Sequence, residues 1–178
     1  VDFLIKIQKI KPKSKLRTIN NKVYFLDKYS TKILHKESDL FFDWYLPLFL
    51  KKSKIIKKRI EIKKILSRIY KKLNYSNRYL VHKDYHVHNL MKVGNKIGVI
   101  DTQDVLIGNP AYDLVSLIDD VRIKTSQKLK KQILKYYLSR AKKIYLCRSK
   151  FFMEDFNILS VQRNLKIIGI FARLYKRD

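Results

Sequence analysis

The chain has 178 residues, of which 46% are apolar, and a single cysteine, Cys147. This length predicts one domain, and the apolar content is enough for a hydrophobic core, which excludes a disordered chain. A lone cysteine excludes an internal disulfide and a cysteine-rich zinc site. No apolar run approaches the roughly 20 residues that cross a bilayer, so we expect no membrane span and a cytoplasmic protein.

The formal net charge is +26, from 41 Lys and Arg against 15 Asp and Glu. A surface this basic attracts polyanions, which leaves nucleic acid, anionic lipid and phosphorylated substrates as partners to consider. Coding sequences rich in A and T also produce chains rich in Lys, Ile and Asn, and we favour this interpretation. The order of the residues, rather than the charge, must therefore indicate function.

The first half of the chain predicts helices. One helix is expected to begin near Ser38, with Ser38 as N-cap and Asp39 in the first turn, where a carboxylate complements the helix dipole. We expect the aromatic residues that follow to lie in the core, namely Phe41, Phe42, Trp44 and Tyr45. Residues 51–72 carry eleven Lys or Arg and one acid. Isoleucines recur at helical spacing in this run, which predicts an amphipathic helix with an apolar stripe of Ile55, Ile56, Ile60, Ile65, Ile69 and Leu73.

The middle of the chain predicts a small β element. Three short apolar runs favour strands, at residues 79–81, 90–93 and 96–100. Gly94 and Asn95 join the last two and indicate a hairpin, because both residue types tolerate positive φ. Asn109 can cap a helix that Pro110 opens, and residues 122–150 predict a second basic amphipathic helix. The fold class is therefore α+β and mostly helical.

Acidic residues are scarce, yet several aspartates gather between positions 84 and 120. Phosphoryl transfer needs a carboxylate to accept the proton of the acceptor hydroxyl, and oxygen ligands to hold Mg²⁺. Asp84 and Asn89 have the spacing of the base and the metal-binding Asn in a kinase catalytic loop, and His82 precedes the base by two residues. Asp101 follows the two strands, where a second Mg²⁺ ligand is expected.

Each of these residues also has a simpler interpretation. The spacing of Asp84 and Asn89 alone is common, and Asp104 and Asp113 are compatible with turn or cap roles. Three histidines of this loop suggest zinc, namely His82, His86 and His88. They lack a clear set of partner ligands, so we expect them to brace the loop through hydrogen bonds. The order of loop, hairpin, Asp, turn and Pro-started helix is far more specific than its parts.

On these motifs the chain resembles the aminoglycoside phosphotransferase and choline kinase superfamily. Residues 81–91 (VHKDYHVHNLM) resemble its catalytic loop, residues 98–104 (GVIDTQD) its metal-binding segment, and residues 108–120 the helix that follows. Residues 161–174 are similar to the bacterial kinases of cell-wall amino sugars, which phosphorylate N-acetylmuramate and N-acetylglucosamine. The resemblance covers roughly residues 25–178.

The resemblance implies phosphoryl transfer from ATP to a hydroxyl of such an amino sugar, with Mg²⁺ as cofactor. Asp84 would be the catalytic base, with His82 supporting the loop. Asn89 and Asp101 would bind Mg²⁺, and Asp113 would brace the catalytic loop. The resemblance places Gln103 and Asp104 close to the metal or the substrate, and it gives no role to Arg163 and Asn164.

The resemblance also implies a domain organisation. Residues 36–178 would form the C-terminal lobe of a protein-kinase-like fold, incomplete at both ends, with its metal site on the small hairpin. Residues 1–35 would be a remnant or linker of the nucleotide-binding lobe. The four glycines form no Gly-rich phosphate loop, so we expect that lobe to be absent here and supplied in cis or in trans.

The sequence departs from the family at Thr102, where the family usually has Phe. Because of Thr102 and the absent lobe, an inactive kinase fragment or pseudokinase is an alternative interpretation. The charge keeps open a basic module that binds nucleic acid without sequence preference.

Overall fold

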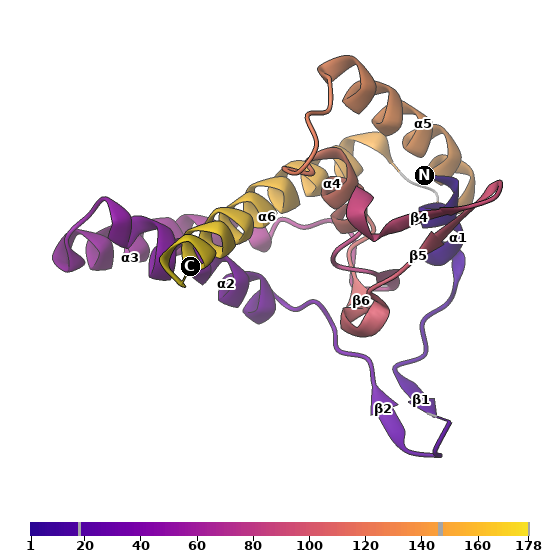
Figure 1. Cartoon of the computed structure of the whole chain (residues 1–178), viewed down its shortest axis with the longest axis horizontal. Coiled ribbons are helices and arrows are strands. Elements are labelled where there is room, and N and C mark those ends of the chain that lie inside the picture. The colour runs from indigo at the N-terminus through magenta and orange to yellow at the C-terminus, as the bar shows by residue number, and fades with distance from the viewer. Residues whose placement is uncertain (18, 146–147, 178) are drawn as a thin grey trace. The chain divides into compact units, whose positions relative to one another are not determined.

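The computed structural model describes residues 1–17, 19–145 and 148–177, and Cys147 therefore lies outside the described residues. The fold is α+β and mostly helical with small hairpins, as predicted (Figure 1). Among the described residues, no helix is long and apolar enough to cross a membrane. The chain divides into two compact units, and each is considered by itself.

The first unit comprises Val1–Tyr29 and Asn74–Phe156. Its elements are α1 (Asp2–Lys9), β1 (Lys15–Arg17), β2 (Val23–Phe25), β3 (Tyr79–Val81), β4 (Leu90–Val93), β5 (Lys96–Val99), β6 (Leu106–Gly108), α4 (Ala111–Ile118), α5 (Gln127–Tyr145) and the start of α6 (Ser149–Arg177). The strands form three antiparallel pairs, β1–β2, β3–β6 and β4–β5. The predicted hairpin is confirmed, and Gly94 takes the positive φ of 56° at its turn.

Two buried polar residues from distant parts of the chain, Gln8 and Asp155, fix the start of α4. The N-cap of α4 is Pro110, one residue after the predicted cap, and Asn109 Oδ1 accepts the Ala111 N–H at 3.0 Å. Its Nδ2 donates to Asp155 of α6 at 2.6 Å. Gln8 of α1 donates from Nε2 to the Pro110 carbonyl at 2.8 Å. The position of α4 therefore depends on contacts that reach both α1 and α6.

Asp155 is fully buried and was not singled out by the sequence. Besides Asn109, its carboxylate accepts the backbone N–H groups of Asn74 at 2.7 Å and Tyr75 at 2.9 Å. A buried carboxylate is tolerated only when such donors replace the water that it loses. Asp155 thus joins α6, the start of α4 and the segment before β3.

The second unit comprises Ser30–Leu73 and Asn157–Asp178. It contains α2 (Thr31–Leu40), a π-helix (Phe41–Tyr45), a 3-10 turn (Leu46–Leu48), α3 (Lys52–Tyr70) and the rest of α6. Phe42 is buried, and the rings of Phe41 and Tyr45 stack at 5.2 Å. The aromatic run therefore contributes to the core mainly through Phe42, since its neighbours are only half-buried.

The prediction that Ser38 starts a helix is wrong. The N-cap of α2 is Ser30, whose Oγ accepts the Ile33 N–H at 3.4 Å. Ser38 is buried in the last turn, where its hydroxyl donates to the Leu34 carbonyl at 2.9 Å. Its oxygen then accepts from the Tyr70 hydroxyl at 2.7 Å, and burial raises the pKa of Tyr70 to about 12, which keeps that donor protonated.

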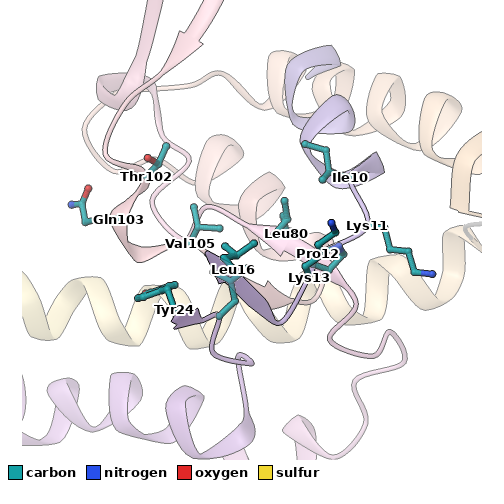
Figure 2. A pocket seen from close by; sticks show the side chains of 11 residues that line it. Ile10, Lys11, Pro12, Lys13, Leu16, Tyr24, Leu80, Thr102, Gln103 and Val105 are labelled. Carbon is teal, nitrogen blue, oxygen red and sulfur yellow. The ribbon is translucent and has the colours of Figure 1, made fainter. Parts of the chain in front are cut away.

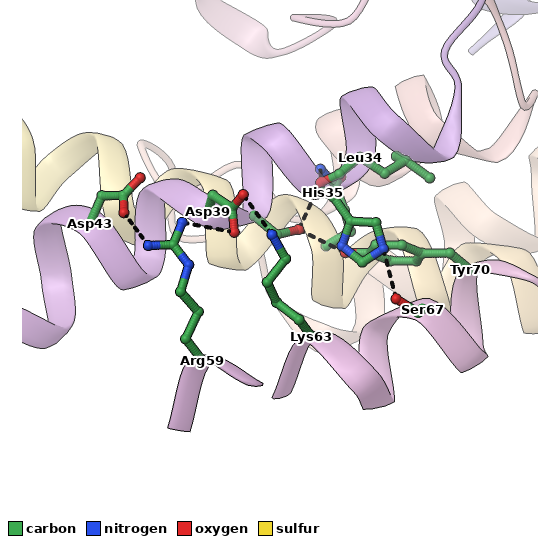
Figure 3. A network of polar contacts seen from close by, with 10 residues as sticks. Leu34, His35, Asp39, Asp43, Arg59, Lys63, Ser67 and Tyr70 are labelled. Carbon is green, nitrogen blue, oxygen red and sulfur yellow. Dashed lines mark hydrogen bonds and ion pairs between the residues drawn. The ribbon is translucent and has the colours of Figure 1, made fainter. Parts of the chain in front are cut away.

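Asp39 pairs with α3 instead of with a helix N-terminus. Its carboxylate lies 3.2 Å from Arg59 and 2.9 Å from Lys63, and Arg59 also pairs with Asp43 at 2.7 Å (Figure 3). These groups are partly exposed, so each pair contributes at most about 1 kcal/mol. The network aligns α2 with the basic face of α3.

The helix over residues 51–72 is confirmed as α3, but the predicted stripe is not its buried face. Leu66 and Tyr70 are the buried residues of α3, whereas Ile56, Ile60 and Ile65 are exposed. At 3.6 residues per turn the six predicted stripe positions cover more than half of the helix circumference, so their spacing alone could not identify the buried side.

We expect Gly169→Ala to destabilise the protein by about 2 kcal/mol. Gly169 is buried in α6, and a Cβ there would overlap the carbonyl carbon of Leu40 and lie 2.5 Å from its oxygen. Helix propensity alone predicts the opposite sign, because Ala is favoured over Gly by about 1 kcal/mol. Urea unfolding measures the difference.

Gly98→Ala is the matched control, since a Cβ there would meet only the Met91 carbonyl at 3.9 Å. Its free energy of unfolding should change by less than about 1 kcal/mol. A stabilised Gly169→Ala would contradict the close approach of α6 and α2.

Candidate active site

The loop between β3 and β4 is held by the carboxylate of Asp113. Asp113 is fully buried in the first turn of α4. Its Oδ2 accepts the His82 N–H at 2.7 Å and its Oδ1 accepts the Lys83 N–H at 2.9 Å. Lys83 has a φ of 78°, a left-handed conformation that a lysine adopts only at a cost. The two hydrogen bonds, here called the Asp113 clamp, fix the backbone immediately before Asp84.

Two further hydrogen bonds connect this loop to the end of the β4–β5 hairpin, and a third lies within the loop. His82 Nε2 donates to the Ile100 carbonyl at 2.9 Å, and since a carbonyl only accepts, Nε2 carries the hydrogen. The Ile100 N–H donates to the Asn89 carbonyl at 3.1 Å. Asn89 donates from Nδ2 to the Asp84 carbonyl at 3.0 Å. Asp84, Asn89 and the residue before Asp101 thus belong to one hydrogen-bonded set.

Asp101 follows this set in an unusual conformation. Its φ of 66° is left-handed, and its side chain is exposed at the start of a 3-10 turn, Thr102–Asp104. Gln103 donates from Nε2 to Asp101 Oδ1 at 2.5 Å. Non-glycine residues in this region cluster at functional sites. The side chains of Gln103 and Asp101 are therefore in contact, while Asp104 is exposed on the same turn.

The oxygen atoms of Asn89 and Asp101 suit a hard cation. Asn89 uses its amide N–H to hold the loop, which leaves its Oδ1 as the atom suited to a metal. Mg²⁺ is usually bound by one or two protein oxygens together with substrate phosphates, so these two ligands fit it. Within residues 1–17, 19–145 and 148–177, no three His, Cys, Asp or Glu side chains gather as a metal site by themselves.

Asp120 supports the same loop and was missed from the sequence. It accepts the Val87 N–H at 3.3 Å and the Arg122 N–H at 3.1 Å. Burial acts to raise the pKa of Asp120, but the backbone hydrogen bonds and the Arg122 guanidinium outweigh burial and hold the pKa below its ordinary value. No local pattern separates Asp120 from its neighbour Asp119, because the partner N–H at Val87 lies 33 residues away.

A cavity of about 570 Å³ shares a wall with the turn that follows Asp101 (Figure 2). Thr102 and Gln103 contribute to it. The other lining residues come from the segment after α1, the β1–β2 hairpin, β3 and the approach to β6, and they are Ile10, Lys11, Pro12, Lys13, Leu16, Tyr24, Leu26, Leu80 and Val105. Most of this lining is aliphatic or aromatic.

The sequence profile of the phosphotransferase enzyme family matches residues 2–146. The chain is similar to the N-acetylmuramate/N-acetylglucosamine kinase of Neisseria meningitidis, with 33% identity over 156 residues, which are 86% of this chain and 47% of the relative. It is also similar to the kinase of that name from Pseudomonas aeruginosa, with 33% identity over 157 residues, 86% of this chain and 46% of the relative. The chain spans about half the length of these relatives.

We expect Asp113→Ala to lower the free energy of unfolding by about 3–5 kcal/mol. The substitution removes two hydrogen bonds to a charged group and leaves the N–H groups of His82 and Lys83 without that acceptor. Urea unfolding followed by circular dichroism measures the change.

Asp104→Ala is the control, because Asp104 is an exposed aspartate of the same unit. It should change stability by less than about 0.5 kcal/mol. Equal stabilities for the two variants would show that the Asp113 clamp does not hold the loop.

Proposed function

This chain belongs to the phosphotransferase enzyme family, and we propose that it is the catalytic part of a kinase that phosphorylates an amino sugar. The phosphoryl group would come from ATP, and the acceptor would be a hydroxyl of a sugar such as N-acetylmuramate or N-acetylglucosamine. The observation that carries the proposal is the hydrogen-bonded set that joins the loop of Asp84 and Asn89 to the residue before Asp101. The names of the two relatives support the choice of acceptor.

Asp84 is the proposed catalytic base. Its carbonyl accepts both the His86 N–H and the Asn89 amide, each at 3.0 Å, so the backbone that carries the carboxylate is held from two sides. In this role the carboxylate orients the acceptor hydroxyl and takes its proton as the oxygen attacks the γ-phosphorus. Phosphoryl transfer relies mostly on positioning and electrostatics, which is what a braced loop provides.

Asn89 and Asp101 are the proposed ligands of Mg²⁺. When bound, Mg²⁺ would neutralise charge on the phosphates. Gln103 would hold the carboxylate of Asp101 through its hydrogen bond, and Asp104 would lie near the metal or substrate. His82 and Asp113 act through the backbone and would position the loop without touching substrate.

Kinases of this type bind the nucleotide between two lobes, and the β4–β5 hairpin offers a surface for the second one. Met91 and Val93 are exposed on one face of the hairpin, Ile97 is exposed on the other face, and Ile100 is exposed at its end. Exposed apolar side chains of this kind are candidates for an interaction surface. We propose that residues 36–178 form a C-terminal lobe, and that a nucleotide-binding part covers this hairpin in cis or in trans.

The first test replaces the base. With the nucleotide-binding part supplied, Asp84→Asn should lower kcat for N-acetylglucosamine or N-acetylmuramate phosphorylation by about 10²–10⁴-fold, because an amide cannot accept the hydroxyl proton. Coupled ADP release measures the rate, and circular dichroism confirms that the variant is folded.

Glu61→Gln serves as the control, since Glu61 is an exposed acid of the second unit. It should keep the full rate. Full activity in Asp84→Asn would remove Asp84 as the base, and an inactive parent protein with a folded loop would favour the pseudokinase interpretation.

The second test concerns Mg²⁺. A ligand that binds only the native state raises the unfolding midpoint, by an amount equivalent to about 2.7 kcal/mol at one hundred times its Kd. With the nucleotide-binding part supplied, Mg²⁺ with ATP should therefore raise the unfolding midpoint, and Asp101→Ala should remove the rise. A rise that persists in Asp101→Ala, or that EDTA does not reverse, would contradict the proposed ligands.

A further inference from the structure

One face of the β1–β2 hairpin forms part of the wall of the cavity beside the Asp101 turn. Leu16 and Tyr24 are direct cross-strand partners, so their side chains lie on the same face, and both line the cavity. Phe25 neighbours Tyr24 in β2 and does not line it. Because side chains alternate along a strand, the hairpin directs one aromatic residue toward the cavity and the next one away from it.

The cavity adjoins the proposed phosphoryl-transfer site. Thr102 and Gln103 form part of its wall, and Gln103 is hydrogen-bonded to Asp101. A Phe at position 102 would bring a large ring to this wall. The smaller Thr102 leaves that space open. A group held in the cavity is therefore next to the residue proposed to bind Mg²⁺.

The lining determines the chemistry of the occupant. Leu16, Tyr24, Leu26, Leu80 and Val105 provide an apolar surface, and Figure 2 shows the amino group of Lys11 pointing away from the other side chains drawn. A volume of about 570 Å³ lies within the range of small-molecule pockets. An acetyl group would fill only a small part of it.

We propose that this cavity binds an apolar substituent of the acceptor that is larger than acetyl, such as a longer N-acyl chain on the amino sugar. The assignment rests on the proposed function for the identity of the acceptor, and on the cavity for the apolar substituent. The substituent would enter between the β1–β2 hairpin and the Asp101 turn. The sugar hydroxyl would remain outside the cavity, on the side of the catalytic loop.

The test compares the binding of N-hexanoylglucosamine with that of N-acetylglucosamine to the whole chain, by isothermal titration calorimetry without ATP. The longer probe adds four methylenes, and each one that is fully buried favours binding about fourfold. We expect N-hexanoylglucosamine to bind about tenfold more tightly, even if the chain is only half buried.

Two aromatic neighbours give a matched pair of variants. Tyr24→Ala should lose most of the tenfold preference, whereas Phe25→Ala should keep it, because both side chains are half-exposed or more on the same strand and only Tyr24 lines the cavity. Thr102→Phe should fill the space and reduce the affinity for N-hexanoylglucosamine to that for N-acetylglucosamine. Unchanged unfolding midpoints would show that the variants are folded.

Equal affinities of the wild-type chain for the two sugars would overturn the proposal, and so would an equal loss in Tyr24→Ala and Phe25→Ala. Displacement of N-hexanoylglucosamine by ATP in the absence of Mg²⁺ would instead assign the cavity to a nucleobase and also overturn it. The readout needs no phosphoryl transfer, so an inactive kinase leaves the result interpretable. Conversely, phosphorylation of both sugars with no preference in binding would refute only the role of the cavity.

Discussion

The candidate site depends on one buried carboxylate, that of Asp113. The loop that follows β3 turns through a left-handed Lys83, so its N–H groups cannot continue the strand ladder and need another acceptor. Asp113 provides both oxygens to them, and its place in the first turn of α4 lets the helix dipole stabilise its charge. Removing it would leave buried donors unsatisfied, which is more costly than never having formed the bonds.

The position of Asp113 is in turn determined by the contacts that fix the start of α4. Gln8 holds the Pro110 carbonyl from one end of the chain, and Asp155 holds Asn109 from the other. Gln8 is itself buried and accepts the Tyr137 hydroxyl at 2.7 Å. The loop that carries Asp84 is thus oriented by side chains more than one hundred positions apart, which is why a short motif has this geometry only inside the folded unit.

These dependencies explain what could be predicted from the sequence. The hairpin at Gly94 and the start of a helix at Pro110 were predictable because their causes are local, a positive φ and a proline at the helix N-terminus. Ser38 resembled an N-cap equally well, but Ser30 takes that role, and only the buried contact with Tyr70 distinguishes them.

The supporting carboxylates could not be predicted from the sequence, because their hydrogen-bond partners are distant along the chain. Asp120 and Asp155 bond to N–H groups 33 and about 80 residues away, so no window of sequence contains both partners. The motif residues Asp84, Asn89 and Asp101 could be selected by spacing alone, but spacing could not reveal what holds them. Local physics determines the elements here, and long-range buried polar contacts determine the site.

Burial distinguishes the residues that position the loop from the proposed metal ligand Asp101. Asp113 and His82, which hold the backbone of the loop, are buried, whereas Asp101, a proposed metal ligand, is exposed. The orientation of an exposed side chain has to come from its neighbours. Ile100 supplies this, because its N–H and its carbonyl are both hydrogen-bonded within the loop set, so the backbone leading into Asp101 is fixed before its own left-handed turn begins. The left-handed turn at Asp101 therefore follows a residue that two hydrogen bonds hold in place, and the side chain of Asp101 is exposed.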